Sequence, residues 1–340
     1  MRRRISLVFF FLGLLFLFFP VILPAQQPVT LTLVEFRPDI PPGNLWVHMF
    51  MDKVKEKSKG RLIVKMIGGP EAIPAHDSAA ACQKGAVDIA STMGMFADVL
   101  GRDILGCEML GYTEYSSAEL RKRGVWKVYQ NRFAKVGLYF LGASTPSDPQ
   151  VQVTFFFKKE IKRLDDFKGL KIASVGGSNK GLIEALGATC IPIPFTEYFT
   201  AMERGVVDGY NVGTPGIQDF GLVPVTKFML DEPVAGCGSF FFVNLKKWES
   251  LPKELKDALT EAAAETEVDG AAAWADLLKK VKKEISEQGV KIGKLSPEES
   301  KKFYRTYRES MWADAYKKFP KQLVDETKQL ITNPDFHRLK

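Results

Sequence analysis

The pattern of hydrophobic and polar residues predicts the same short α/β unit twice along the chain. In each copy an apolar strand leads to two glycines, in Gly60–Gly69 (GRLIVKMIGG) and in Asp166–Ser178 (DFKGLKIASVGGS). In each copy a helix then ends with glycine before another short strand, at Ala81–Ile89 and at Ala201–Gly209. This repetition predicts two related α/β lobes, and the space between two such lobes is a common place for a small molecule to bind.

Several further elements of the two lobes follow from the same periodicities. In the first lobe we expect strands over 29–34, 62–67, 87–91 and 138–141. We expect helices over 45–58, 77–85 and 117–133. The segment 143–149 is predicted to cross to the second lobe, where a strand covers 151–157, and 233–243 is predicted to return to the first lobe. Two crossings of this kind form a hinge about which the lobes can open and close.

One long helix is predicted between Pro252 and Gly289, with apolar residues along one face. At 1.5 Å per residue it is roughly 50–55 Å long, more than one lobe of this size, so we expect it to lie across both lobes. Gly270 is the position where it bends most easily. More helix is predicted over 296–312 and 323–330. The expected domains are a signal peptide over 1–25, lobe one over 28–146 and 236–270, and lobe two over 147–235 and 271–340.

The first residues have the pattern of a secretory signal peptide. Met1–Arg4 contains three arginines, 5–19 is almost wholly apolar, and 20–25 leads to polar residues, so we expect cleavage after Ala25 and export to the periplasm. The alternative is an uncleaved membrane anchor, which needs roughly 20 apolar residues, and this run is near that length. No other apolar segment has that length, so we expect a soluble mature protein.

The composition is that of a folded protein. Hydrophobic residues make up 46% and charged residues 26% of the chain, which excludes a disordered protein. The net charge of +7 includes the three arginines of the leader; without them 44 basic residues stand against 40 acidic ones, a net charge of +4. No basic patch contains interleaved aromatic residues, so we expect no nucleic-acid partner. The four cysteines, Cys82, Cys107, Cys190 and Cys237, leave three disulfide pairings open, and buried thiols are equally compatible with their spacing.

The search for catalytic chemistry is negative. No HExxH, GxSxG, Walker A or GxGxxG motif occurs. Asp88 and Asp208 occupy the same place in the repeated unit, so we expect a structural role for both. Gly176–Gly181 resembles a phosphate loop without its terminal Gly-Lys-Ser/Thr; a serine-capped turn is the favoured interpretation, and an anion site at a helix N-terminus is the alternative. We therefore expect no enzyme, no cofactor and no metal site.

Taken together, the motifs resemble the DctP-type solute-binding proteins of TRAP transporters. In that family DLKGLKIR leads to ALGA and ALxxGVVDG, and this chain has DFKGLKIA at 166–173, ALGA at 185–188 and AMERGVVDG at 201–209. The segment 243–252 is similar to the family's VNxxxWxxLP, and GGPEAIP at 68–74 is a further shared phrase. Each motif is weak alone, but in this order they are specific, and the resemblance covers nearly the whole mature chain.

The resemblance implies an α/β, two-lobed periplasmic-binding-protein fold, with two sheet-centred domains, a hinge and a long helix along the back. It also implies a function: capture of a small organic acid in the periplasm and delivery to a two-component TRAP permease driven by an ion gradient. We expect the protein to be a monomer. Two other classes remain open, an ABC-type binding protein, which a neighbouring ATPase would indicate, and a secreted α/β enzyme.

The expected ligand-facing residues lie at strand ends and at motif positions. They are Glu35, Phe36, Arg37, Met93, Met95, Phe96, Phe155, Phe157, Ala173, Ser174, Pro194, Phe195, Tyr198 and Asn211. In the family, the position of Ala173 carries an arginine that pairs with the ligand carboxylate through two hydrogen bonds, a geometry that lysine does not reproduce. Either the ligand is not a simple carboxylate or another cation replaces that arginine, and Arg37 is the preferred substitute, ahead of Lys180 and Lys171. The aromatic residues favour a ligand larger or more apolar than a C4 dicarboxylate.

Overall fold

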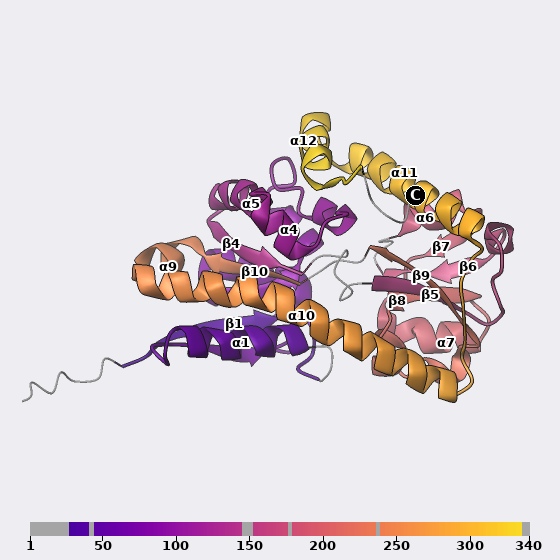
Figure 1. Ribbon diagram of the computed structural model, residues 1–340, viewed down its shortest axis with the longest axis horizontal. Coiled ribbons are helices and arrows are strands. Elements are labelled where there is room, and N and C mark those ends of the chain that lie inside the picture. Colours follow the sequence, from indigo (N-terminus) through magenta and orange to yellow (C-terminus); the bar gives the residue numbers. More distant parts are fainter. Residues whose placement is uncertain (1–26, 41–43, 145–151, 176–178, 236–238, 335–340) are drawn as a thin grey trace, which may run out of the picture.

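The computed structural model describes residues 27–40, 44–144, 152–175, 179–235 and 239–334. They form two lobes, each built on one β-sheet, and a long helix crosses from one lobe to the other (Figure 1). The predicted leader and most of the first predicted crossing lie outside the described residues, as do Gly177, Ser178 and Cys237.

Sheet one has the strand order β2-β1-β3-β10-β4. β1 is parallel to β2 and β3, whereas β10 is antiparallel to β3 and β4. The strands are β1 (Val29–Glu35), β2 (Leu62–Gly68), β3 (Ile89–Met93), β4 (Leu138–Ala143) and β10 (Ser239–Asn244). The helices of this lobe are α1 (Leu45–Lys57), α2 (Ser78–Lys84), α3 (Gly94–Ala97), α4 (Ser117–Lys122), α5 (Val125–Ala134) and α9 (Leu245–Ser250).

The single helix predicted over 117–133 is two helices. Ser116 and Glu119 form a capping box at the start of α4. Gly124, between α4 and α5, has a φ of 76°, a left-handed conformation that glycine adopts without steric cost and that ends a helix. The prediction missed the break because both helices bury their apolar residues in the same core, so the hydrophobic period continues through the glycine.

Sheet two has the strand order β11-β9-β5-β8-β6-β7. β5 is antiparallel to β8 and β9, β6 is parallel to β7 and β8, and β11 is parallel to β9. The strands are β5 (Gln152–Phe157), β6 (Lys171–Ala173), β7 (Thr189–Ile191), β8 (Gly209–Gly213), β9 (Phe228–Ala235) and β11 (Lys291–Gly293). The helices are α6 (Lys180–Ala185), α7 (Tyr198–Glu203) and α8 (Gly216–Asp219). Short 3-10 helices in the two lobes are η1 (Ala75–Asp77), η2 (Asp98–Leu100), η3 (Glu108–Tyr112), η5 (Leu164–Phe167), η7 (Phe195–Glu197) and η8 (Val223–Val225).

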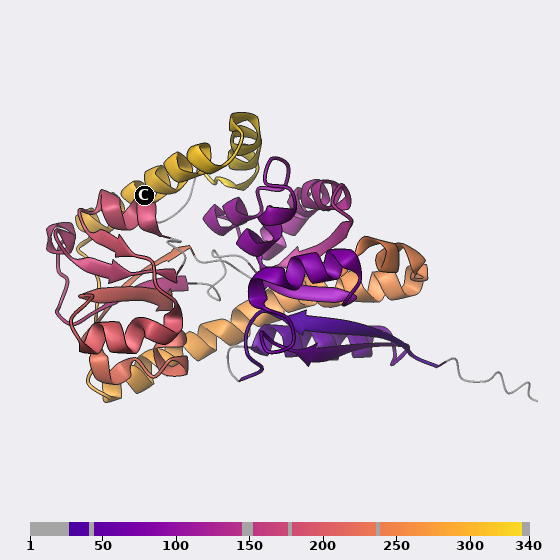
Figure 2. The ribbon, with the colours of Figure 1, turned by 180° about the vertical axis from the view of Figure 1, so that it is seen from behind.

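The long helix α10 (Lys253–Glu287) contains 35 residues and joins the two lobes, as the views from the front and from behind both show (Figures 1 and 2). Leu259 in its first half is buried in the core of lobe one, and Ile285 near its end is buried in the core of lobe two. The helix continues through Gly270 without interruption. The prediction of one helix across both lobes is therefore confirmed.

The C-terminal helices α11 (Pro297–Lys318) and α12 (Lys321–Ile331) also connect the lobes, along the upper edge in Figure 1. Phe303 near the start of α11 packs in the core of lobe two, whereas Trp312 near its end packs in the core of lobe one, as does Val324 in α12. The predicted boundary, which gave all of 271–340 to lobe two, differs from this arrangement. Periodicity reveals the apolar face of a helix but does not say which lobe that face covers.

The repeated sequence unit plays the same part in both lobes. Asp88, just before β3, accepts hydrogen bonds from the backbone N–H and the hydroxyl of Thr32 in β1, at 2.8 and 3.1 Å. Asp208, just before β8, accepts a hydrogen bond from the backbone N–H of Lys171 in β6, at 2.8 Å. Each aspartate thus holds two parallel strands together, which confirms the structural role predicted for the pair.

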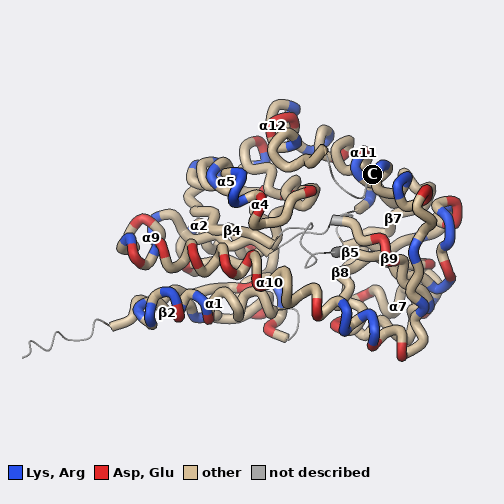
Figure 3. The backbone as a smooth tube through the Cα atoms, in the orientation of Figure 1, with Lys and Arg blue, Asp and Glu red and all other residues tan. Residues whose placement is uncertain are grey.

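Charged residues of both signs are distributed over both lobes (Figure 3). Within the described ranges no helix has the length and apolar character needed to cross a membrane. The same ranges contain no group of three or more His, Cys, Asp or Glu side chains arranged to hold a metal ion. Cys82, Cys107 and Cys190 form no disulfide with one another.

Candidate functional site

The carboxyl ends of parallel strands in the two sheets point toward each other. β4 ends and β10 begins at the two crossings, so the edge of sheet one at which β1 and β3 end faces lobe two. β5 begins and β9 ends at the same crossings, so the edge of sheet two at which β6 and β8 end faces lobe one. Open α/β sheets bind ligands at the carboxyl ends of their strands. The two facing edges therefore define the candidate site.

On the side of lobe one, Glu35 and Arg37 form an ion pair at the end of β1. Arg37 donates from Nε to Glu35 Oε1 at 2.9 Å and from Nη2 to Ser239 Oγ, at the start of β10, at 2.8 Å. The side chain of Glu35 is fully buried, whereas that of Arg37 is 27% exposed. The guanidinium carbon also lies 4.7 Å from the centre of the Phe36 ring. The cation singled out from the sequence as a substitute is thus already bound to a carboxylate and a hydroxyl.

Three buried polar atoms near this edge have no hydrogen-bond partner among the described residues: Glu35 Oε2, Ser91 Oγ and Trp46 Nε1. Glu35 pairs in register with Ser91 of β3, and Ser91 pairs in register with Phe241 of β10, so the three side chains share one face of sheet one. Trp46, in the first turn of α1, stacks on Phe241 with ring centres 5.9 Å apart. Buried polar atoms without partners are rare in folded proteins, and each requires an explanation.

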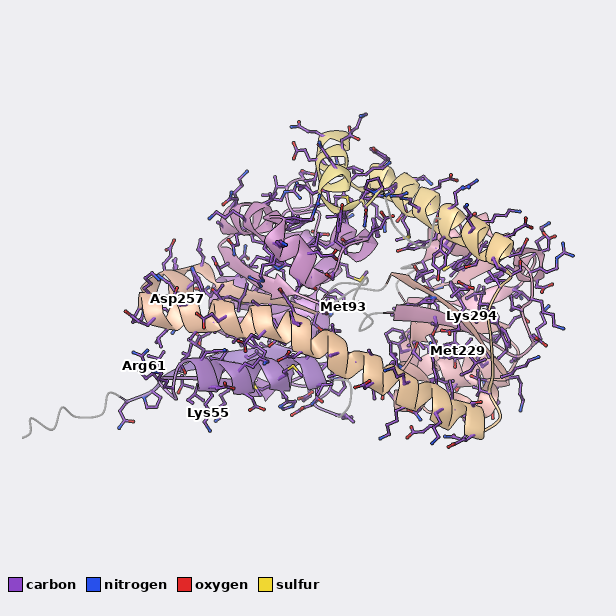
Figure 4. The ribbon with its side chains drawn as sticks, in the orientation of Figure 1. Lys55, Arg61, Met93, Met229, Asp257 and Lys294 are labelled. Carbon is purple, nitrogen blue, oxygen red and sulfur yellow. The ribbon has the colours of Figure 1, made fainter. Side chains whose placement is uncertain are left out.

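The end of β3 and the short helix α3 place Met93, Met95 and Phe96 beside this edge, and all three are half-buried. Met93 pairs in register with Ser239, the residue that accepts a hydrogen bond from Arg37. Figure 4 shows Met93 at the part of lobe one nearest to lobe two. Methionine side chains adapt to irregular apolar surfaces, so this segment supplies a deformable apolar wall next to the ion pair.

On the side of lobe two, Ala173 ends β6 and is fully buried. It pairs in register with Tyr210 of β8 and belongs to the same apolar cluster as Tyr198. Burial raises the pKa of the Tyr198 hydroxyl, so this group stays protonated at neutral pH. The next residue, Ser174, donates its backbone N–H to the carbonyl of Ile191 at 3.0 Å. The place of the family arginine is therefore an alanine beside aromatic rings.

An aromatic group continues from this cluster toward the surface. Phe195 contacts Tyr198 edge-on with ring centres 5.4 Å apart, and it stacks on Phe220 with ring centres 5.0 Å apart. Pro194 is exposed, and Phe220 is 40% exposed. Asp219 is exposed when the whole residue is considered, but its carboxyl group is partly removed from water. This desolvation raises the pKa of the carboxyl group, and the positive charge of Arg37 opposes the rise. The influence of Arg37 on this carboxylate connects the two lobes electrostatically.

The remaining candidates lie elsewhere in sheet two. Phe155 and Phe157 are fully buried and pack edge-on against Phe167, with ring centres 5.9 and 5.5 Å apart. Their core lies on the opposite face of the sheet from the cluster around Ala173, because neighbouring residues of a strand point to opposite faces. We therefore leave both phenylalanines out of the proposed site. Asn211, the register partner of Phe155, is buried, and its Nδ2 has no partner among the described residues.

Sequence analysis missed five residues of these edges: Trp46, Ser91, Asp219, Phe220 and Ser239. A serine within an apolar strand is a detectable signal for Ser91, since it interrupts a run that otherwise belongs in a core. The other four lie at element ends whose position relative to the facing lobe is fixed only by tertiary structure.

Two sheet-centred lobes with facing strand ends, joined by a helix along one side, are the architecture of periplasmic solute-binding proteins. Residues 37–318 match the family described as bacterial extracellular solute-binding protein, family 7 (DctP), and the chain belongs to this family. The resemblance seen in the motifs is thereby confirmed. The family is one of transport subunits rather than enzymes, and its members are extracytoplasmic.

Solved structures and curated relatives agree with this assignment. A TRAP periplasmic solute-binding protein from Ochrobactrum anthropi has a TM-score of 0.76 and 21% identity, covering 90% of this chain and 95% of that one. Another, from Desulfovibrio desulfuricans with bound sn-glycerol-3-phosphate, has a TM-score of 0.74 and 21% identity, covering 90% and 98%. The monocarboxylate 2-oxoacid-binding periplasmic protein of Nostoc sp. is 26% identical over 223 residues, which are 63% of this chain and 59% of the relative. The match to an uncharacterized Haemophilus influenzae protein covers 32% of that relative, so the chain spans less than two thirds of the length of each of these two relatives.

Proposed function

We propose that this protein is the periplasmic receptor of a TRAP-type transporter, which captures a small organic acid between its lobes and delivers it to membrane permease subunits. The observation that carries the proposal is the pair of facing strand edges, which bring Arg37 of lobe one into the electrostatic range of lobe two. The names of two similar proteins support an acidic ligand, since one binds monocarboxylate 2-oxoacids and the other was solved with sn-glycerol-3-phosphate.

Arg37 is the residue that we propose as the anion-binding group in place of an arginine at position 173. A guanidinium has five N–H donors, and two of them are used in the bonds to Glu35 and Ser239, so donors remain for a ligand. Glu35 offsets part of the positive charge, which weakens the attraction for an anion relative to an unpaired arginine. We propose that Met93, Phe195 and Tyr198 supply the apolar contacts.

The proposal is tested with purified mature protein and an extract of small metabolites. Native mass spectrometry after incubation and buffer exchange is expected to show one added mass of a small acid. A bound solute at 100 times its dissociation constant adds about 2.7 kcal/mol to the free energy of unfolding, and X-ray scattering is expected to show a smaller radius of gyration. A protein that retains no solute and scatters identically in both conditions contradicts the proposal.

We also propose that the leader is cleaved after Ala25 and that the mature protein is a periplasmic monomer. The arginines of Met1–Arg4 and the apolar run over 5–19 support export. N-terminal sequencing of the exported protein is expected to begin at or within a few residues of Gln26, and size-exclusion chromatography to give the mass of one chain. An intact N-terminus recovered with the membrane fraction favours the uncleaved anchor instead.

A further inference from the structure

The helix α11 passes from one lobe to the other within about two turns. Tyr304 packs in the core of lobe two, Trp312 packs in the core of lobe one, and Tyr307 contacts both cores. Arg308 lies one turn after Tyr304 and one turn before Trp312. Because the helix is continuous over 297–318, it leaves lobe two and enters lobe one at Tyr307 and Arg308.

One carboxylate of lobe one holds this point of the helix. Glu114, between η3 and α4, accepts hydrogen bonds from Arg308 Nη2 at 2.7 Å and from the backbone N–H of Asn333 at 2.6 Å. Its own backbone N–H donates to the carbonyl of Ile331, the last residue of α12, at 3.1 Å. The Glu114 side chain is 9% exposed, so its charge-assisted bond to Arg308 is largely shielded from water. Glu114 thus joins the middle of α11 and the end of α12 to lobe one.

The first turn of α11 is attached to lobe two instead. Ser300 donates its hydroxyl hydrogen to Glu232 Oε2 in β9 at 2.9 Å, and Glu232 is buried. Glu299 accepts a hydrogen bond from the backbone N–H of Leu164 at 2.6 Å. A helix of 22 residues, roughly 33 Å long, is therefore attached to lobe two at its start and to lobe one from its middle onward.

The long helix α10 is a second continuous connection, on the other side of the molecule. In both views α11 runs along the upper edge and α10 along the lower side (Figures 1 and 2). Two helices that are attached to both lobes on opposite sides restrict rotation of the lobes toward either side. In a protein that closes around its solute, the separation of the lobes determines whether the solute can enter.

We infer that Glu114 is a positioning residue: by binding Arg308 it fixes α11 to lobe one, and it thereby holds the two lobes within a narrow range of separations before a solute binds. The inference rests on the proposed function only for the importance of that separation to solute capture. Loss of the Glu114 carboxylate detaches the middle of α11 from lobe one. The expected result is a wider range of separations in a protein that is still folded.

Double electron–electron resonance measures this separation in the full mature protein, freed of solute by dialysis. Spin labels are attached through a genetically encoded azide at positions 122 and 204, so that the native cysteines are not involved. Lys122 in α4 and Arg204 directly after α7 are both exposed and belong to different lobes. The wild type is expected to give one narrow distance distribution, and Glu114→Ala a distribution at least about 1.5-fold wider. Glu114→Gln keeps one acceptor oxygen and is expected to widen the distribution less.

Two further variants separate this role from a general loosening of the C-terminal helices. Arg308→Met removes the partner of Glu114 and keeps the aliphatic stem, so it is expected to widen the distribution as well. Asp325→Asn is the matched control, because Asp325 accepts hydrogen bonds from Tyr316 of α11 and Lys321 of α12 and so joins these two helices to each other. Circular dichroism checks the fold, and Arg308→Met decides the question if Glu114→Ala does not fold. Unchanged distributions in the folded variants of Glu114 and Arg308, or equal widening in Asp325→Asn, overturn the inference and leave the proposed function standing.

Discussion

Gly142 of β4 packs so closely on Glu267 of α10 that a Cβ atom at position 142 would lie 2.5 Å from Glu267 Oε1. The buried Glu267 carboxylate accepts hydrogen bonds from Nε and Nη2 of Arg121, both at 2.7 Å, and from Trp126 Nε1 at 3.0 Å. The backbone N–H of Ala143 lies 3.4 Å from the same carboxylate. The long helix is thus attached to lobe one at the last residues of β4 before the first crossing.

Gly142→Ala is expected to lower the free energy of unfolding by about 1–3 kcal/mol, the usual range for overpacking a core. The added methyl group would also lie 2.7 Å from Arg121 Nη2, and neither side chain can move without breaking the buried ion pair. Urea denaturation measures the change. Gly213→Ala is the control, because a Cβ atom there would meet nothing within 4 Å. Equal stability of the two variants would contradict this account of the contact.

Arg37→Ala is expected to destabilise the protein without ligand by about 2–3 kcal/mol, because it leaves the buried Glu35 without its ionic partner. Arg37→Lys keeps the charge but cannot donate to Glu35 and Ser239 from two separate nitrogens, so a smaller loss of stability is expected. Chemical denaturation of both variants provides the measurement. A loss below about 0.5 kcal/mol for Arg37→Ala would mean that the ion pair contributes no net stability.

Ala173→Arg is expected to be several kcal/mol less stable than Ala173→Met, a variant of similar length without charge. The new guanidinium would enter the apolar cluster that contains Tyr198 and Tyr210, and burying a charge among apolar side chains is costly. Millimolar succinate is expected to restore part of the melting temperature of the arginine variant alone, because a carboxylate pairs with a guanidinium. Arginine and methionine variants that melt together, with no response to succinate, would refute the prediction.

Asp98 is expected to make the unfolding free energy fall as the pH rises from about 4 to 7. Burial raises the pKa of its carboxyl group to about 7, although the backbone N–H groups of Cys107 and Glu108 both donate to it at 2.6 Å. In the unfolded chain the pKa is about 3.9. Between these values the folded state keeps a proton that the unfolded chain has lost, so each rise in pH favours the unfolded chain, by up to about 1.4 kcal/mol per pH unit.

Asp98→Asn removes the titrating group and is therefore expected to flatten this part of the pH profile. Urea denaturation of both proteins at pH 5, 6 and 7 gives the slopes, and Asp103→Asn, an exposed neighbour, is the control. Identical slopes for the wild type and Asp98→Asn would show that Asp98 does not titrate in this range.

Much of the architecture could be predicted because short-range patterns determine it. The alternation over 29–34, the glycine after α2 and the continuous stripe of α10 each reflect a local period, and the strand and helix types followed. The position of α12 could not be predicted, because its apolar face is compatible with either lobe. The ends of elements were less certain for the same reason that Gly124 was missed: a local break does not disturb a period shared by two helices.

The site was less predictable than the fold. Glu35 and Arg37 were predicted as ligand-facing from their place at the end of a strand. The ion pair between them, which occupies part of the Arg37 guanidinium, could not be predicted because it depends on tertiary structure. Phe155 and Phe157 were indistinguishable from ligand-facing aromatics, because a strand buried on both faces has no polar residues to mark the orientation. Tryptophan is a largely apolar residue, and only the unpartnered N–H of Trp46 in the structure indicates a polar role.

The position of β10 between β3 and β4 has a consequence for the order of folding. All strands of sheet two except β11 lie between β4 and β10 in the chain, so sheet one lacks the strand that joins β3 to β4 until those residues have been made. Sheet two in turn waits for β11, which follows the long helix. Neither lobe can be completed from the N-terminus onward, and a ribosome or translocase that releases the chain gradually exposes unpaired strand edges for most of the process. Folding of this chain is therefore a late event in which both lobes are completed nearly together.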